Sequence, residues 1–180
     1  MTVATTMESA PSAAAEVLTR EQFEVFYAQT ARALRSYICR VSANSAQADD
    51  TLQEAYVRML SAPPMTEAGR KSYLYRTATN LIVDQQRAQS RRRRWWQLLP
   101  SRAEAAPNTV ELSSDMERLF AKLSYRERAL LWLAYVEGND HAEIARILGL
   151  TPGSVKVLLL RARRKMESIL KKHGFEGAHD

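Results

Sequence analysis

The side chains of this chain that could do chemistry are mostly basic, and they gather in two blocks. Residues 70–94 carry eight Arg or Lys and one acid, and residues 151–172 carry seven Arg or Lys and one acid. Since the whole chain has a net charge of only +6, its other segments together are acidic. Two basic blocks on an otherwise acidic chain predict two surfaces that bind a polyanion such as nucleic acid. The alternative is two helix faces that are merely solvated.

Few side chains suit catalysis or metal binding. His141 and His173 have no partners arranged for acid–base or nucleophilic work, and the single cysteine, Cys39, cannot form an internal disulfide. No Cys/His cluster has the spacing of a zinc site, so we expect no metal, no cofactor and no enzymatic activity. The start of the chain does not resemble a signal peptide, and no apolar run could cross a membrane. We therefore expect a cytoplasmic protein without membrane insertion.

The segment 140–166 predicts a helix, a tight turn and a second helix. Asp140 and Glu143 form the pattern of a capping box, and Gly149 stands where the first helix must end. Thr151 is expected to cap the second helix, whose far end is basic. This is the pattern of a helix-turn-helix, in which the basic end suits phosphates. The alternative is an ordinary helical hairpin with a solvated basic end.

The rest of the chain predicts an all-α fold of two small helical domains joined by a flexible linker, with the helix-turn-helix in the C-terminal domain. Helices are expected from Thr19 to the break at Asn44, over residues 46–60 and over residues 71–87. Four consecutive arginines repel one another, which disfavours a helix at residues 91–94. The predicted parts are a disordered tail at 1–17, a domain at 18–96, a linker at 97–110, a domain at 111–173 and a tail at 174–180.

Two helix faces could bind partners. In the helix expected at 46–60, Asp50, Gln53 and Glu54 lie opposite the apolar face, either as a solvated acidic face or as a binding face. The helix expected at 71–87 carries an aromatic, amide and guanidinium stripe. Stacking, hydrogen-bonding and phosphate-binding groups together suit single-stranded bases, and an ordinary solvated face is equally open. The members of that stripe are Tyr73, Arg76, Asn80, Asp84 and Arg87.

Three motifs in this order resemble a bacterial extracytoplasmic-function sigma factor, the two-domain type of RNA polymerase specificity subunit. The segment Ala48–Leu60 is similar to the family's polymerase-docking helix, and Ser72–Arg87 to its helix for the minus-ten promoter element. The segment Leu123–Met166 is similar to its domain for the minus-thirty-five element. The resemblance covers the chain from about Thr19 to Lys172. It implies a protein that binds core RNA polymerase, recognises a two-part promoter and initiates transcription.

The resemblance also implies roles for individual residues. It makes Asp50, Gln53 and Glu54 contacts to core polymerase. The loop Pro63–Gly69, together with Asn80, would form the pocket for a flipped base. The implied contacts to the minus-ten element are Arg76, Asn80, Arg87 and Arg91. The implied contacts to the minus-thirty-five element are Thr151, Ser154, Lys156, Val157, Arg161, Arg163 and Arg164. The implied partners are core RNA polymerase, promoter DNA and an anti-sigma factor.

One departure from the family pattern concerns the second helix of the helix-turn-helix. Val157 and Leu158 stand where the family commonly has a Ser-Arg pair, and Leu160 adds a third apolar side chain. Such side chains cannot form the bidentate hydrogen bonds that recognise guanine, although they can contact thymine methyl groups or pack on protein. Recognition through DNA shape and phosphate contacts is then expected to carry more weight.

Two other functions fit parts of the pattern. A helix-turn-helix transcriptional regulator would use the N-terminal half as a dimerisation or sensor domain and bind a palindrome as a dimer. A pure interaction protein would bind one protein partner and no DNA. Co-purification discriminates among the three functions, because only a sigma factor is expected to retain core polymerase.

Overall fold

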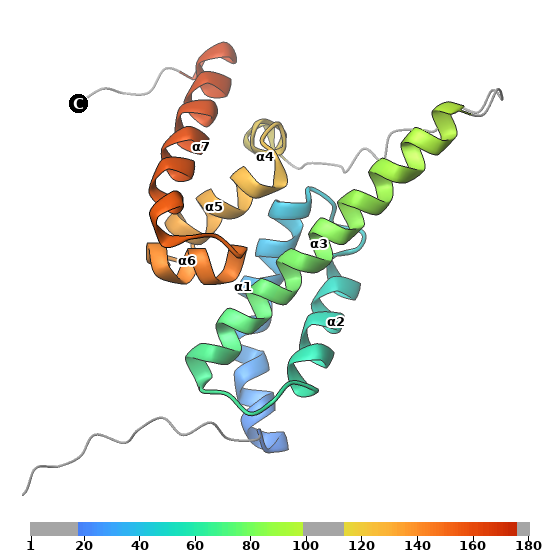
Figure 1. Ribbon diagram of the computed structural model, residues 1–180, viewed down its shortest axis with the longest axis vertical. Coiled ribbons are helices and arrows are strands. Elements are labelled where there is room, and N and C mark those ends of the chain that lie inside the picture. The colour runs from blue at the N-terminus through green and yellow to red at the C-terminus, as the bar shows by residue number, and fades with distance from the viewer. Residues whose placement is uncertain (1–17, 99–113, 176–180) are drawn as a thin grey trace, which may run out of the picture.

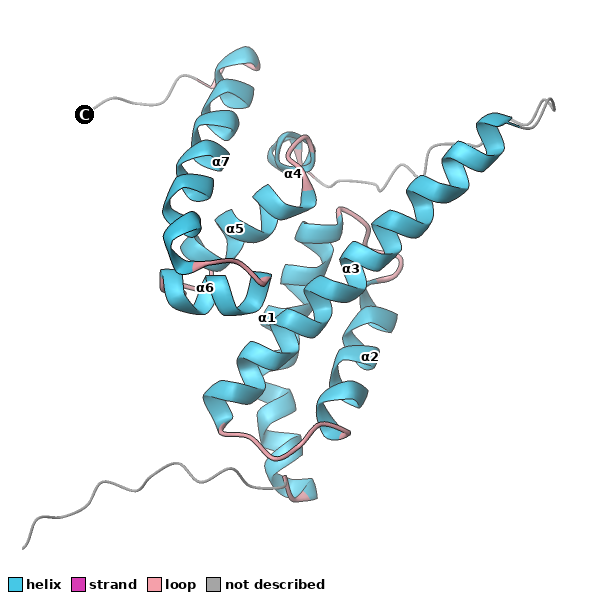
Figure 2. Cartoon of the chain, viewed as in Figure 1, coloured by secondary structure: helices cyan, strands magenta, loops and turns pink. Residues whose placement is uncertain are grey.

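The secondary structure of the protein, described from a computed structural model for residues 18–98 and 114–175, consists of α-helices (Figures 1 and 2). Three of them, α1 to α3, belong to the N-terminal half, and α4 to α7 belong to the C-terminal half. Their bounds are α1 Arg20–Ser42, α2 Ala48–Leu60, α3 Glu67–Leu98, α4 Asp115–Ala121, α5 Tyr125–Tyr135, α6 His141–Leu148 and α7 Pro152–Lys172. The predicted all-α fold is confirmed, whereas the tail 1–17 lies outside the described residues.

The N-terminal helices pack around one apolar core. Helix α1 starts with a capping box at the predicted Thr19, because the Thr19 hydroxyl accepts from the Gln22 backbone N–H and the Gln22 side chain accepts from the Thr19 N–H. Leu34 and Tyr37 of α1 are fully buried, and the Tyr37 hydroxyl lies 2.6 Å from the Thr79 hydroxyl of α3. Such buried polar groups need a partner, and this pair satisfies both.

Helix α3 is longer than the sequence predicts at both ends. It begins four residues before Lys71 because the Thr66 hydroxyl accepts the backbone N–H of Gly69 and thereby caps the first turn. The expected break at residues 91–94 is wrong, since the helix continues through them to Leu98. Arginine is a good helix former, and exposed charges repel weakly in water, so propensity outweighs repulsion here. Two residues of the predicted linker are therefore helical, and its residues 99–110 lie outside the described part.

The C-terminal helices include the predicted helix-turn-helix. Asp140 caps α6 by accepting the Glu143 N–H at 2.8 Å, and Gly149 ends α6 with a φ of +62°. Helix α6 lacks the second bond of the predicted capping box, from the Asp140 N–H to the Glu143 side chain. The Glu143 carboxylate instead contacts Ser72 and Arg146. Thr151 occupies the N-cap position of α7, although its side chain makes no capping bond.

The two halves pack against each other. Helix α6 lies along α3, and α5 contacts α1, so the buried side chains of both halves form one continuous cluster. Figure 1 shows α4 to α7 gathered on one side of α3, whose C-terminal part extends away from the other helices. This arrangement brings the two segments that resemble promoter-binding helices into one compact unit.

Candidate polymerase and nucleic-acid interface

The predicted acidic face of α2 lies on the surface. Asp50 and Gln53 are exposed, and Glu54 is half-buried and pairs with Arg58, with 2.6 Å between Arg58 Nε and Glu54 Oε1. The opposite side of α2 is buried, as the wheel predicts, through Leu52, Ala55, Tyr56 and Met59. A helix held by one apolar face leaves its acidic face available for a basic partner.

Asp49, next to that face, is already engaged within the domain. Its carboxylate accepts two hydrogen bonds from the Arg35 guanidinium, at 2.6 and 3.1 Å. The hydrogen bond from Arg35 lowers the pKa of Asp49 below its ordinary value. Asp49 therefore contributes to the link between α1 and α2, whereas Asp50 faces solvent.

The predicted polar stripe of α3 is exposed along most of its length. Arg76, Asn80, Asp84 and Arg87 are exposed, while Tyr73 is half-buried and lies with its hydroxyl 3.5 Å from the Arg58 carbonyl. The opposite side is buried through Leu74, Tyr75, Ala78 and Ile82, and Leu81 is half-buried. One face of α3 thus presents amide and guanidinium groups, as expected for a helix that contacts bases and phosphates.

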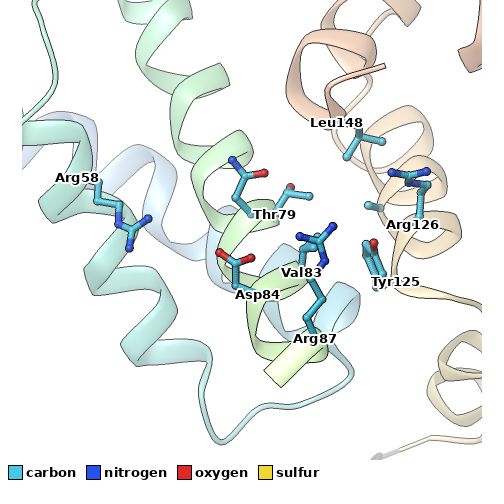
Figure 3. A pocket seen from close by; sticks show the side chains of 10 residues that line it. Arg58, Thr79, Val83, Asp84, Arg87, Tyr125, Arg126 and Leu148 are labelled. Atoms are coloured by element: carbon cyan, nitrogen blue, oxygen red, sulfur yellow. The ribbon is translucent and has the colours of Figure 1, made fainter. Parts of the chain in front are cut away.

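A cleft of about 380 Å³ lies between this stripe and the C-terminal half. Asp84 and Arg87 of α3 line one wall, and Tyr125 and Arg126 of α5 line the other (Figure 3). Asn80 of α3 also lines the cleft. The sequence indicated neither α5 residue as part of a site. No local sequence pattern predicts that these two residues line a cleft, because the cleft exists only where the two halves meet.

The loop Pro63–Gly69 does not contribute to the lining described for this cleft. Gly69 precedes Asn80 by eleven positions in the same helix, a separation of roughly 16 Å along the axis. The implied base pocket of this loop and Asn80 is thus distinct from the cleft, and it stays a prediction. Arg58, at the end of α2, is the cleft residue closest in sequence to the loop.

A basic track continues along α3 beyond the cleft. Arg87, Arg91 and Arg94 line a recess of about 430 Å³ that again reaches Tyr125. Their spacing of four and three residues places the guanidinium groups on one side of the helix. Because phosphates are bound mainly through such groups, this track extends the candidate nucleic-acid surface toward the end of α3.

Helix α7 presents the other predicted contacts. Ser154 is half-buried, and its hydroxyl donates to the Thr151 carbonyl at 2.8 Å. Arg163 lines an apolar groove between α4, α5 and α7, away from the tip of the helix-turn-helix. The remaining predicted contacts are exposed: Thr151, Lys156, Val157, Arg161 and Arg164.

The three apolar residues of α7 at the departure from the family pattern, Val157, Leu158 and Leu160, divide between core and surface. Leu158 packs against the buried cluster, so it serves the fold. Val157 and Leu160 are 48% and 46% exposed, and they lie among basic side chains. Two apolar side chains therefore remain on the candidate DNA-binding face, where thymine methyl groups or a protein could cover them.

Arg128 of α5 is a buried residue that the sequence-based prediction missed. It is only 6% exposed, and its Nε donates to the Val41 carbonyl of α1 at 2.8 Å. Its Nη1 donates to the carbonyls of Leu123 and Ala121, at 2.6 and 3.0 Å. Burial lowers the pKa of Arg128 to about 10, so the guanidinium stays charged at neutral pH. A charged residue on the apolar face of α5 was the signal in the sequence.

Other kinds of site find no support in the described residues. No group of three or more His, Cys, Asp or Glu side chains among them could hold a metal ion. None of the helices within residues 18–98 and 114–175 is long and apolar enough to cross a membrane.

The comparisons with known proteins agree with the two halves of the fold. The family model for sigma-70 region 2 matches residues 26–92, and the model for sigma-70 region 4 matches residues 113–166. A solved structure of the sigma factor RpoE in complex with the anti-sigma factor NepR, from Bartonella quintana, has the same fold. Its TM-score is 0.65 at 20% identity, and the match covers 84% of this chain and 98% of that one.

Relatives that match over most of their length belong to the same family. The sigma factor SigL of Mycobacterium tuberculosis is 29% identical over 156 residues, which cover 82% of this chain and 88% of SigL. SigD of Mycobacterium bovis is 30% identical over 158 residues, covering 82% of this chain and 74% of SigD. SigW of Bacillus subtilis is 27% identical over 154 residues, which cover 73% of this chain and 80% of SigW. With the acidic face of α2, the polar stripe of α3 and the helix-turn-helix all in place, the chain belongs to the extracytoplasmic-function sigma factors of RNA polymerase.

Proposed function

We propose that this sigma factor divides its work among three helix faces. The acidic face of α2 binds core RNA polymerase, the polar stripe of α3 binds the minus-ten element, and the exposed face of α7 binds the minus-thirty-five element. The observation that carries the proposal is the exposed stripe of α3 with Arg76, Asn80 and Arg87. An ordinary helix-turn-helix regulator needs no second helix that contacts bases.

Charge complementarity supports the assignment of α2. Asp50 and Gln53 face solvent and Glu54 is half-buried, so a basic surface of the polymerase can approach without disturbing the core. Charges arranged in this way accelerate encounter and exclude wrong partners more than they add affinity. The same residues contribute little to folding, since an exposed ion pair such as Glu54–Arg58 contributes about 0–1 kcal/mol.

The side chains of α3 support contact with a separated strand. Asn80 can form hydrogen bonds to a base edge, and the track of Arg87, Arg91 and Arg94 can follow the phosphates beside it. The helix would then bind bases that are accessible only once the duplex has opened. This fits a factor that recognises a promoter and helps to melt it.

The side chains of helix α7 suit recognition of duplex DNA, with fewer hydrogen bonds to guanine than the family pattern would give. Lys156 lies near the leading end of the helix, where base edges are reached, and Val157 can contact a thymine methyl group. Arg161 and Arg164 lie further along the helix, where phosphates are met. We propose that the minus-thirty-five element contributes through shape and phosphate contacts as well as through bases.

We further propose an anti-sigma factor as a partner, a cytoplasmic location and no catalytic activity of the chain itself. The sigma factor RpoE, which shares the fold, was solved with an anti-sigma factor bound. In this chain, Val157 and Leu160 offer such a partner exposed apolar area, as do Met116, Tyr135 and Val136 on the second domain. The protein would act while bound to core polymerase and promoter DNA.

Competition for core polymerase tests the assignment of α2. The double variant Asp50→Ala/Glu54→Ala should keep its fold but lose affinity for the core enzyme, and run-off transcription from a two-part promoter should fall with it. The matched control is Glu21→Ala/Glu24→Ala, which removes the same charge and also one i,i+4 ion pair, Arg20–Glu24, from the exposed side of α1. Equal core affinity for the two double variants would contradict the assignment.

A further inference from the structure

The cleft between α3 and α5 presents a cationic group from each of its two walls. Arg87 of α3 and Arg126 of α5 line it, and both side chains are exposed. Within residues 18–98 and 114–175, neither guanidinium group takes part in a hydrogen bond or an ion pair. Two like charges that share a cleft repel each other, and an anion placed between them removes that repulsion. The cleft therefore favours an anionic ligand.

The basic recess along α3 adjoins this cleft. The recess has a volume of about 430 Å³ and shares Val83, Arg87 and Tyr125 with the cleft. Arg91 and Arg94 add two more guanidinium groups, and the described residues that line the recess include no acid. Because a guanidinium group binds phosphate oxygens through parallel N–H donors, the recess suits a ligand that carries more than one phosphate.

The cleft itself offers groups that suit a base. Tyr125 is half-buried and supplies an aromatic ring on which a base can stack. Asn80 and Asp84 line the cleft with an exposed amide and an exposed carboxylate. Because an ionised carboxylate only accepts hydrogen bonds, Asp84 favours a base edge with adjacent N–H donors. Guanine has such an edge in its N1–H and N2–H₂ groups, whereas adenine presents N1 as an acceptor.

The spacing of these groups along α3 fits a single nucleotide. Asn80, Asp84, Arg87, Arg91 and Arg94 follow one another at intervals of four and three residues, so they share one side of the helix. Asp84 and Arg94 are ten positions apart, which is roughly 15 Å along the helix axis. An extended nucleotide can therefore place its base at Asp84 and its phosphates at the arginines. The volumes of about 380 and 430 Å³ are those of small-ligand sites.

We propose that the cleft and the adjoining recess bind a free guanine nucleoside diphosphate or triphosphate. The base lies against Tyr125 and Asp84, and the phosphates lie on the arginines of α3. This site goes beyond the proposed function, which assigns α3 to a strand of promoter DNA. A nucleotide in the cleft covers Asn80 and Arg87, so it competes with that strand, and only this consequence rests on the proposed function.

Isothermal titration calorimetry of the full chain with GTP tests the site without polymerase or DNA. GTP should bind at one site per chain, and guanosine and tripolyphosphate, which each lack one part of it, should bind at least about tenfold more weakly. Arg126→Ala should weaken GTP binding about tenfold, because the α5 wall loses its cation.

Arg32→Ala is the matched control, since it removes the same charge from an exposed position of α1 outside both pockets. The absence of GTP binding would overturn the proposal. Tripolyphosphate binding as tightly as GTP would do the same, because the site would then recognise phosphates alone. An equal loss of GTP affinity for the Arg126 and Arg32 variants would place the nucleotide elsewhere.

The preference between bases tests the role of Asp84. The unchanged chain should bind GTP at least about tenfold more tightly than ATP, since adenine sets an acceptor against the carboxylate. Asp84→Asn should remove most of this preference, because an amide can both donate and accept. Equal affinities of the unchanged chain for GTP and ATP, or a preference that survives in the variant, would overturn the assignment of guanine.

Displacement of a single strand tests the consequence for promoter binding. Fluorescence anisotropy would follow a labelled single-stranded minus-ten segment on the full chain. GTP should displace this strand from the unchanged chain at a concentration at least about tenfold lower than from Arg126→Ala. GTP that binds without displacing the strand would overturn the competition. A strand that does not bind at all would contradict the proposed function of α3, whereas calorimetry would still decide the nucleotide site.

Discussion

Helices α3 and α7 carry the two candidate DNA-binding faces, and they are presented differently. The face of α3 with Asn80 and Arg87 looks onto α5 across a cleft, whereas Lys156 and Val157 of α7 point to solvent. Helix α3 is also buried on both sides of that face, since it lies between α2 and α6. Access to this face of α3 is therefore coupled to the position of the other domain, while access to α7 is not.

The difference follows from what each helix does in the fold. Helix α3 is the central element, so any rearrangement of the second domain changes its surroundings. Helix α7 closes the second domain from outside, with Val155, Leu159 and Ala162 buried and the other side left open.

The largest expected effect concerns Arg128, which joins the second domain to the first. Arg128→Ala should lower the free energy of unfolding by about 2–3 kcal/mol, because buried backbone carbonyls lose their donor. Urea unfolding followed by circular dichroism measures it. Arg126→Ala, two residues earlier and exposed, is the control and should stay within about 0.5 kcal/mol. Similar values for the two variants would mean that Arg128 stabilises neither domain.

The next prediction distinguishes the faces of α3 and α7 by the promoter element that each binds. Asn80→Ala should weaken binding to a single-stranded minus-ten segment by about 1–2 kcal/mol and leave the ranking of minus-thirty-five elements unchanged. Lys156→Ala should do the reverse, with a cost of about 1–3 kcal/mol on the preferred element if the side chain contacts a guanine. Fluorescence anisotropy of the holoenzyme on both panels gives the measurement. If both variants changed the same panel, the assignment of one face would be wrong.

A smaller effect distinguishes two arginines on α7. Both side chains are exposed, but Arg163 lines the apolar groove between α4, α5 and α7, whereas Arg164 is not among the residues that line it. Arg164→Ala should therefore reduce the salt dependence of promoter binding by about one unit of slope, while Arg163→Ala should leave it nearly unchanged. Affinity measured over a series of salt concentrations decides between them. An equal loss of slope for both variants would mean that α7 docks in the DNA groove at another angle.

The smallest effect is a pH dependence within the second domain. Glu127 caps α5 and pairs with Lys165 of α7 at 2.7 Å. Burial would raise the pKa of Glu127, but hydrogen bonds from Lys165 and Ser124 outweigh it and lower the pKa. Its contribution, under about 1 kcal/mol, is then present above the unfolded pKa and lost as pH falls through the folded one. Melting temperatures from pH 7 to pH 4 should fall less steeply for Glu127→Gln, and an equal slope would contradict the role of this carboxylate.

The sequence by itself determined the local elements. The helix start at Thr19, the cap at Asp140 and the helix end at Gly149 depend on side chains within four positions. A pattern of a few residues was therefore enough to predict them. The all-α class followed from apolar spacing in the same way. The extent of α3 was missed because repulsion among four arginines is weak at the surface, while helix propensity adds up along the segment.

Only the tertiary structure decided which side chains meet across the two halves. The contacts of Arg128 with Val41 and of Ser72 with Glu143 join positions 87 and 71 residues apart, and no local pattern encodes such a distance. The same holds for the cleft that sets Tyr125 and Arg126 opposite Asn80. Helical periodicity fixes which face of each helix is apolar, but the pairing of faces depends on the packing of the whole chain. That packing set α5 across a cleft from part of the polar stripe of α3 and left the outer face of α7 open.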